Sequence, residues 1–555
     1  MARFSLSAST VDWSARRLDA LALVALATGL GIRLWASLVT FANPDEAYHA
    51  LLSTPVDFGD LYASAIRSPH PPLFILLLHY VRRITVSDLG LRMIPLAAGT
   101  LFPWVMYRWI SRGWNRYAGL GALAILSLAP EMIKVGSEAR AYTMALLFMA
   151  GGLYFIDRAI QTSSPWRMAG FGLCLYGAIL SDYSAAFFAA AAGVYFLLRI
   201  REQNVTAGVR ILWELSQVGA IALYAILWVT QIHPMRAIAT TRADVEGWLR
   251  EAYLQAGQNV LFFVIHNTSR QFAFLLPLLV PAVSAMLLFA TGLYLLWRRP
   301  APGSMWHSRA TAVLLVLPFA ATCAAAMIHL FPYGRSRHTI FLGLFIAAGV
   351  GIAMDKVARG WIVPLVALGI AATPLWHLIE GQHKWETARV DTRKRYMEEA
   401  IAFLKKSVPP GAVLLSESEM RVVLAYYLDS GVRLPEAQGT PSIETVGAWK
   451  ILCNRWGFGS IEDLRGDLRL LRGHFGLGPD ARIWVLDGGF RPLLEPDLIK
   501  LHRAGEAPEL FRFGRALVAL LTPPGFFWEA PTPADRIPDR PPQSPSQPAI
   551  PNYQP

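Results

Sequence analysis

Residues 19–46 read DALALVALATGLGIRLWASLVTFANPDE. Residues 19–41 form an apolar run long enough to cross a bilayer, which requires about 20 residues. The polar segment Asn43-Pro44-Asp45-Glu46 follows directly, so two carboxylates stand where the helix leaves the membrane. Charged groups at a membrane boundary favour a functional role, because polar groups at that depth are costly. We therefore expect this segment to open an active-site loop.

The composition extends the membrane prediction to the whole chain. Of 555 residues, 54% are hydrophobic and 16% are charged, whereas about 25% are charged in an ordinary soluble domain. The net charge of +12 does not indicate a nucleic-acid partner, because Lys and Arg occur mainly in short clusters between apolar segments. The three cysteines lack metal-ligand spacing and predict no disulfide framework. The sequence therefore predicts a polytopic α-helical membrane protein.

Apolar stretches of membrane-spanning length divide the first 380 residues. Eleven spans are expected, near residues 19–41, 89–110, 117–134, 141–158, 166–181, 183–199, 209–230, 271–297, 309–330, 338–355 and 359–380. The basic clusters between them place the N-terminus in the cytoplasm, as in a multi-pass protein of the cell inner membrane. Residues 1–380 form the predicted transmembrane domain, with outer loops 42–88 and 231–270. Residues 71–86 are too short to cross and should form a helix at the outer interface.

The pattern changes after residue 380. Strand-like stretches at 412–416, 482–487 and 515–521 alternate with helical stretches, which predicts an extracytoplasmic α/β domain over residues 381–527. The helices are expected at residues 419–429, 443–455, 461–475 and 492–503. The domain has no nucleotide-binding or zinc spacing, so support or acceptor docking is its expected role. Residues 528–555 are rich in Pro, Ser and Gln and should be disordered.

Asp45 is the candidate general base. A partly desolvated carboxylate near a substrate can take a proton from an attacking hydroxyl. Asn43 or Asp45, followed by Glu46, could equally cap a helix. His49 lies four residues after Asp45 on the same helical face, so the two side chains could bind a divalent ion such as Mg²⁺ or Mn²⁺. A capped interfacial helix with a hydrogen-bonded histidine is the alternative.

Further polar side chains fall near the same outer surface in this topology. Arg140, Arg335 and Arg337 are candidate ligands of a phosphate, because a guanidinium forms paired hydrogen bonds to phosphate oxygens. The alternative is that these arginines only extend to the interface. The proline-flanked His70 would fit a structural turn as well as a site. The candidates for positioning a substrate are Glu46, His70, Tyr142, Asp182 and Tyr183.

The order of these motifs resembles that of the GT-C glycosyltransferases, a family of polytopic membrane enzymes. The motifs are Pro44-Asp45-Glu46 after the first span, His70-Pro71-Pro72-Leu73 before a short apolar helix, Ser137-Glu138-Ala139-Arg140-Ala141-Tyr142 before the fourth span, Asp182-Tyr183 between two spans, and Arg337 at a late span. The likeness is to the bacterial branch related to protein O-mannosyltransferases and to the aminoarabinose transferase of lipid A. It covers about residues 19–430.

The resemblance implies a polyprenyl-phosphate sugar donor and an acceptor on the outer side of the membrane, which could be an envelope lipid, polysaccharide or protein. It also implies inversion at the anomeric carbon. If the family's residue roles are transferred to the matching positions, Asp45 is the base that activates the acceptor and Arg140 contacts the donor phosphate. Arg337 matches an arginine that the family often follows with Tyr, whereas His338 follows here. Family members differ in metal dependence, so the resemblance leaves open whether the protein uses a divalent ion.

Two other classes of function fit a basic polytopic chain. A transporter or lipid flippase should show charges or Gly and Pro breaks near the bilayer midplane and two related halves, and neither is clear in this sequence. A noncatalytic component of envelope polysaccharide assembly would tolerate the loss of Asp45. Replacing Asp45 therefore separates the enzyme from the alternatives.

Overall fold

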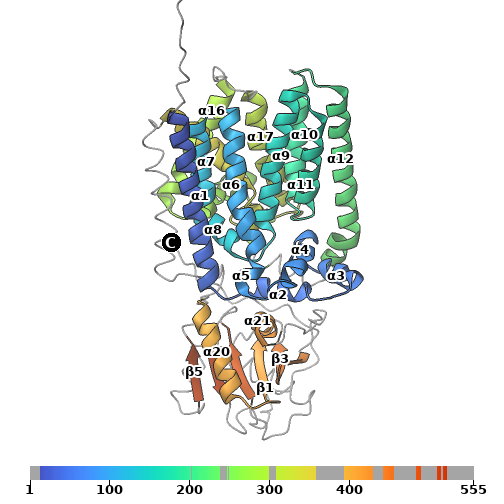
Figure 1. Cartoon of the computed structure of the whole chain (residues 1–555), viewed down its shortest axis with the longest axis vertical. Helices are drawn as coiled ribbons and strands as arrows, with labels where there is room; N and C mark the ends of the chain where they lie inside the picture. The colour runs from blue at the N-terminus through green and yellow to red at the C-terminus, as the bar shows by residue number, and fades with distance from the viewer. Residues whose placement is uncertain are drawn as a thin grey trace, which may run out of the picture.

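The computed structural model describes residues 13–201, 203–237, 247, 249–298, 308–357, 393–428, 442–454, 483–488, 509–513 and 517–521. Its long helices gather in one bundle, and a β-sheet with two helices lies beyond the ends of the bundle (Figure 1). The short helices α2 (Pro44–Leu52), α3 (Phe58–Ala65), α4 (Leu73–Arg82) and α5 (Asp88–Leu91) lie between the two parts (Figure 1). This intermediate layer carries the candidate site.

Each predicted span that falls on described residues contains a helix. The helices are α1 (Trp13–Val39), α6 (Met93–Gly113), α7 (Arg116–Leu128), α8 (Pro130–Ser137), α9 (Tyr142–Thr162), α10 (Pro165–Ile179), α11 (Ala185–Ile200), α12 (Ala207–Leu227), α16 (Leu279–Arg298), α17 (Ser308–Met327) and α18 (Leu342–Val357). The span expected at 359–380 lies outside the described residues.

The polytopic helical fold class is thereby confirmed. Within the described part of the chain, five helices are long and apolar enough to cross a membrane, or six if the bent pair α7 and α8 counts as one span. The two helices of this pair meet at 57°. The other helices of the bundle are shorter or less apolar, so the number of crossings stays a prediction.

The segment expected as the outer loop 231–270 is instead partly helical. A π-helix over Trp228–Ile232 and α13 (His233–Ala237) extend α12, and α15 covers Val260–Leu275. The side chain of Asn259 caps α15 by accepting the N–H of Phe262. A single span from 271 to 297 was wrong, because Leu276 before Pro277 is extended and separates α15 from α16.

The C-terminal part is the predicted α/β domain. Its six-stranded sheet has the order β2-β3-β1-β4-β6-β5, with β1 (Val413–Glu417) parallel to both neighbours and the outer pairs antiparallel. The remaining strands are β2 (Ser442–Val446), β3 (Trp449–Asn454), β4 (Ile483–Asp487), β5 (Glu509–Phe513) and β6 (Leu517–Leu521). Helices α20 (Lys394–Ser407) and α21 (Ser418–Leu428) accompany the sheet (Figure 1).

One secondary-structure prediction in this domain needs correction, and one further strand was missed. Residues 443–455 form the hairpin of β2 and β3 and not a helix. Gly447 takes a positive φ of 57° in the two-residue turn between Val446 and Trp449, a geometry that suits a tight hairpin and favours glycine. The strand β5 was not predicted. The helices expected at 461–475 and 492–503, the boundary near 380 and the tail 528–555 lie outside the described residues.

Candidate active site

The first turn of α2 is built by Asn43 and Glu46. The Asn43 side chain accepts the N–H of Glu46 at 3.1 Å, and the Glu46 carboxylate accepts the N–H of Asn43 at 3.0 Å. This reciprocal pair is a capping box, and Pro44 occupies the first helical position. Asn43 is therefore the helix cap. The carboxylate of Asp45 takes no part in the capping and is directed to other partners.

Glu46 and Arg92 form a buried ion pair that joins four segments. Arg92 Nε and Nη2 donate to the two Glu46 oxygens at 2.7 and 2.8 Å, and both side chains are 1% exposed. The guanidinium also donates to the carbonyls of Ser37, Thr40 and Phe41. Glu46 further accepts the N–H of Ala139 at 2.7 Å. Removing one partner of such a pair leaves a buried charge, which costs about 3–5 kcal/mol.

This pair fixes the positions of the residues on either side of it. Asp45 precedes Glu46, and Arg140 follows Ala139, so the bonds of Glu46 hold both backbones in place. The four protein hydrogen bonds to Glu46 occupy its carboxylate. Glu46 thus holds the backbone on both sides of the site, and its predicted part in positioning a substrate stays a prediction.

Asp45 lies between two arginines that are distant in sequence. Its carboxylate is ion-paired with Arg140 and, at 3.0 Å, with Nη2 of Arg337. The Arg140 side chain is 1% exposed and the Asp45 side chain 36%. Burial opposes ionisation of Asp45, but the two guanidiniums outweigh it and hold the pKa of the carboxyl below its usual range. Asp45 is therefore ionised, and its side chain is more exposed than that of either arginine.

Arg140 carries a second ion pair. Its Nε lies 3.0 Å from Oε2 of Glu138, whose own pKa is raised by burial. Arg335, which the sequence placed in the same set, is exposed, and no contact joins it to Asp45 among the described residues. The arginines that meet the carboxylate are Arg140 and Arg337.

Three histidines and a tyrosine line the adjacent wall. The ring of His70 lies 5.7 Å from that of His49, 5.5 Å from that of Tyr142 and 6.5 Å from that of His338. Nδ1 of His49 lies 3.0 Å from the carbonyl of Ala139, so Nδ1 carries the proton. Burial lowers the pKa of His49 to about 4 and holds the pKa of His70 well below its usual value. These two rings are therefore neutral at pH 7.

The turn that carries His70 is held from the π-helix that extends α12. Nε2 of Gln231 donates to the carbonyls of Ser68 and His70 at 2.7 and 2.8 Å. Sequence reasoning missed Gln231, because it lies more than 160 residues from its partners in a segment expected to be a loop. The proline-flanked turn at His70 is thus both a structural turn and part of the site wall.

A small cavity of about 10 Å³ opens beside the two arginines, enough for one water molecule. It is lined by Glu131, Lys134, Val135, Glu138, Arg140, Tyr142 and Arg337. The hydroxyl of Tyr142 is buried and has no hydrogen-bond partner in the described part of the chain. Glu131 and Lys134 were missed, although two charges at the end of a predicted span are a recognisable signal.

Asp182 and Tyr183 lie in the turn between α10 and α11. The carboxylate of Asp182 is 5% exposed and accepts the N–H of Ser184 at 2.8 Å, and burial raises its pKa to about 6. The carbonyl of Tyr183 accepts the hydroxyl of Tyr224. The N–H of Leu73 donates to Leu180, which joins this turn to the start of α4. Asp182 therefore stands close to the site wall but makes no contact with Asp45.

The surroundings of Asp45 do not fit a divalent ion. Two guanidiniums already neutralise the carboxylate, and His49 uses Nδ1 for a carbonyl. No group of three or more His, Cys, Asp or Glu side chains that could hold a metal ion occurs in the described ranges. A cation placed at Asp45 would be repelled by both arginines.

Comparison with known families supports the motif resemblance. Residues 69–228 match the family model of the dolichyl-phosphate-mannose-protein mannosyltransferases. The predicted resemblance to the GT-C glycosyltransferases is confirmed. The matched segment contains His70, Arg140, Tyr142 and the Asp182 turn, whereas Asp45 and Arg337 lie outside it. No curated protein matches the chain in sequence.

Several solved structures are similar to this chain. ArnT from Cupriavidus metallidurans bound to undecaprenyl phosphate has a TM-score of 0.49 at 12% identity, covering 92% of this chain and 98% of that one. An oligosaccharyltransferase from Archaeoglobus fulgidus in the apo form has a TM-score of 0.44 at 12% identity, covering 74% and 63%. The arabinosyltransferase EmbB from Mycobacterium smegmatis has a TM-score of 0.37 at 13% identity, covering 65% and 37%.

Proposed function

We propose that the protein is an inverting glycosyltransferase. It would move a sugar from a polyprenyl-phosphate donor to an envelope glycan, lipid or protein on the outer face of the bacterial inner membrane. The observation that carries this proposal is the position of the Asp45 carboxylate between Arg140 and Arg337, beside the cavity lined by Tyr142. A base and two phosphate-binding cations are the groups that this reaction requires.

In the proposed reaction, one negative charge passes from the carboxylate of Asp45 to the leaving phosphate, and the same two arginines would contact both groups. The acceptor hydroxyl oxygen forms a bond to the anomeric carbon, and the bond from that carbon to the phosphate oxygen breaks. The proton passes to the carboxylate of Asp45, and the bonding electrons leave with the lipid phosphate. Arg140 and Arg337 stabilise the charge that develops on this leaving group, since preorganised donors need no reorientation in the transition state.

The ion pairs with the arginines also control the basicity of Asp45. While both guanidiniums bind the carboxylate, its lowered pKa makes it a weak base. A donor phosphate that draws the guanidiniums toward itself would raise that pKa. The carboxylate would then gain basicity only when a donor is present, which would limit proton abstraction to the loaded site.

The decisive experiment replaces Asp45 with Asn. This variant keeps the size of the side chain but cannot take the proton, so transfer should fall by about 10²- to 10⁴-fold, as for other lost general bases. The assay would use the full chain in lipid nanodiscs, undecaprenyl-phosphate hexoses and pentoses as donors, and native envelope membranes as acceptor. Binding of undecaprenyl phosphate should persist.

The matched control is Asp57→Asn. Asp57 is an exposed carboxylate in the same outer loop, where it caps α3 by accepting the N–H of Gly59 and Asp60. Asn is an equally good cap, so this variant should transfer sugar at the parental rate. Transfer by Asp45→Asn at the parental rate would overturn the role of Asp45. If the parent chain released no lipid phosphate from any donor, a transporter or an assembly component would replace the enzyme.

A further inference from the structure

We propose that Tyr427, in the C-terminal domain, is a positioning residue for Asp45. This inference rests on the proposed function, because it gives the C-terminal domain a part in holding the proposed base. The geometry that carries it is a set of hydrogen bonds between α21 and the segments on either side of the site. No residue of the C-terminal domain was expected to act in this way.

The hydroxyl of Tyr427 joins two of these segments. Its oxygen accepts the N–H of Ala42 at 2.8 Å, and its proton is donated to Oδ2 of Asp88 at 3.0 Å. Ala42 is fully buried and directly precedes Asn43, the residue that caps α2. The bond to Ala42 therefore fixes the point from which the first turn of α2, and Asp45 within it, begins.

Asp88 links Tyr427 to the helix that precedes the buried ion pair of Arg92 and Glu46. Its carboxylate is 5% exposed and also accepts the hydroxyl of Tyr426 at 2.9 Å, and it lies 3.2 Å from the ammonium group of Lys394. Asp88 begins α5, which ends just before Arg92. Arg92 in turn binds Glu46 of α2. Tyr427 therefore contacts both the residue before α2, Ala42, and the helix before Arg92, which begins at Asp88.

Tyr427 stands on a firmly packed helix. Met420, Val423 and Leu424 of α21 are fully buried in one hydrophobic cluster with Ala47 and Leu51 of α2. The packing of α21 against α2 thus fixes the position of the hydroxyl relative to α2. A hydroxyl on a mobile loop could not impose a position, whereas one on a packed helix can.

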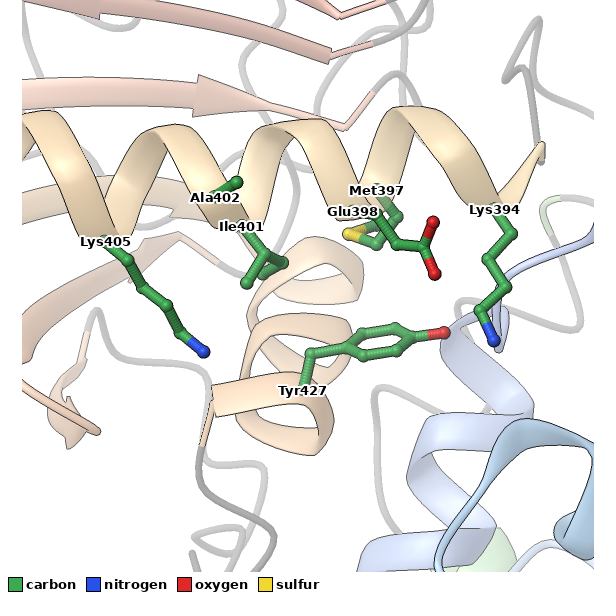
Figure 2. A pocket seen from close by; sticks show the side chains of 7 residues that line it. All are labelled: Lys394, Met397, Glu398, Ile401, Ala402, Lys405 and Tyr427. Atoms are coloured by element: carbon green, nitrogen blue, oxygen red, sulfur yellow. The ribbon is translucent and has the colours of Figure 1, made fainter.

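Figure 2 shows the surroundings of the Tyr427 ring. A pocket of about 260 Å³ lies along α20, lined by Lys394, Met397, Glu398, Ile401, Ala402, Lys405 and Tyr427. The hydroxyl points toward the Lys394 end of the pocket (Figure 2). The ring forms part of the pocket wall, so a phenylalanine would keep this packing. Tyr427→Phe therefore removes the hydroxyl with little other change.

The expected consequence is a loss of turnover. Without the hydroxyl, the buried N–H of Ala42 has lost its acceptor, and an unsatisfied group of this kind is unfavourable in a fixed conformation. The start of α2 should shift to find another partner. Because proton transfer depends steeply on geometry, we expect kcat to fall by about tenfold while the KM for the lipid donor stays within about twofold.

The experiment compares Tyr427→Phe with Tyr426→Phe in the full chain in nanodiscs. Tyr426 shares Asp88 with Tyr427 but has no bond to Ala42. Its variant should lose a similar contact between the domains and keep kcat within about twofold. Release of undecaprenyl phosphate from undecaprenyl-phosphate sugars gives kcat and KM for both variants. A general loss of stability would reduce the folded fraction, and with it the apparent kcat, of both variants to a similar extent, so a fall confined to Tyr427→Phe points to the bond with Ala42.

Hydrogen exchange gives a readout that does not depend on transfer. The peptide that contains residues 40–46 should exchange faster in Tyr427→Phe than in the parent, and at the parental rate in Tyr426→Phe. Unchanged exchange, or equal kcat values for the two variants, would overturn the role of Tyr427. If the parent chain transferred no sugar but exchange still increased, the proposed function would fail while the structural link between Tyr427 and α2 would stand.

Discussion

Nη2 of Arg33 donates a hydrogen bond to the carbonyl of Leu126 at 3.1 Å. Leu126 lies four residues before Pro130, which has no N–H to complete the helical bond. Arg33 therefore satisfies the acceptor left open where α7 bends into α8. Gly136 makes room for this side chain, since a Cβ there would lie 2.6 Å from Nε of Arg33. The bent pair that leads to Arg140 is thus held from α1.

A double-mutant cycle tests this relationship. Arg33→Met keeps most of the side-chain volume but leaves the Leu126 carbonyl unsatisfied, which costs about 1–3 kcal/mol. Pro130→Ala restores an N–H that can bond the same carbonyl. The double variant should therefore be more stable than the sum of the single changes predicts, by about 1 kcal/mol. Denaturant unfolding in detergent measures the four stabilities. Additive changes would show that Arg33 and the break at Pro130 are independent.

Arg140→Lys and Arg337→Lys test the proposed phosphate contacts. Lysine keeps the charge but lacks the planar pair of donors, so the affinity for undecaprenyl phosphate should fall by about tenfold, the equivalent of one charge-assisted hydrogen bond. The control is Arg270→Lys, because Arg270 pairs with the exposed Glu251 and not with Asp45. Titration of each variant in nanodiscs measures the affinity. Equal affinities in all three variants would show that the two arginines hold Asp45 but do not bind the donor phosphate.

Asp182 should make stability depend on pH. Burial raises its pKa from 3.8 to about 6, so the folded chain binds this proton more tightly than the unfolded chain does. The contribution of this group to stability therefore falls as the pH rises from about 4 to 6, by a total of about 3 kcal/mol, and is constant above that range. Asp182→Asn keeps the acceptor for Ser184 and should abolish this part of the dependence. Melting temperatures between pH 4 and 7 that change alike in parent and variant would contradict this.

Reporter fusions test the predicted topology. A phosphatase that works only outside the cytoplasm should be active when fused after Leu521, at the end of β6. The same enzyme fused after Arg298, beside a basic cluster expected in the cytoplasm, should be inactive. The opposite pattern would invert the orientation and place Asp45 on the cytoplasmic side.

Much of the fold could be predicted because it follows from local rules. The thickness of the bilayer sets the length of an apolar helix, and each span placed on described residues contains a helix. The strands β1, β4 and β6 were expected from short apolar runs. The hairpin at 442–454 was missed because its pattern fits a helix as well, and the pairing of β3 with β1 decides between the two.

The candidate site was predicted in part. Asp45, Arg140 and Arg337 were each singled out, but the choice of Asp45 or Asn43 as the cap was left open. Arg92 was missed, although a charge inside the span predicted at 89–110 is a signal of the same kind as Glu131 and Lys134. Its partner Glu46 lies 46 positions away in the chain, so only their contact in the fold reveals the role of both.

The sequence by itself determined the apolar helices, the presence of a sheet domain and the polar segments that follow the helices, because solvent and hydrocarbon act on each segment separately. The tertiary structure decided which of those polar groups meet. Asp45 joins Arg140 from 95 positions away, and the N–H of Ala42 finds Tyr427 at 385. Such pairs depend on how helices pack. A local sequence pattern cannot predict that packing, because the two partners lie in segments that are far apart in the chain.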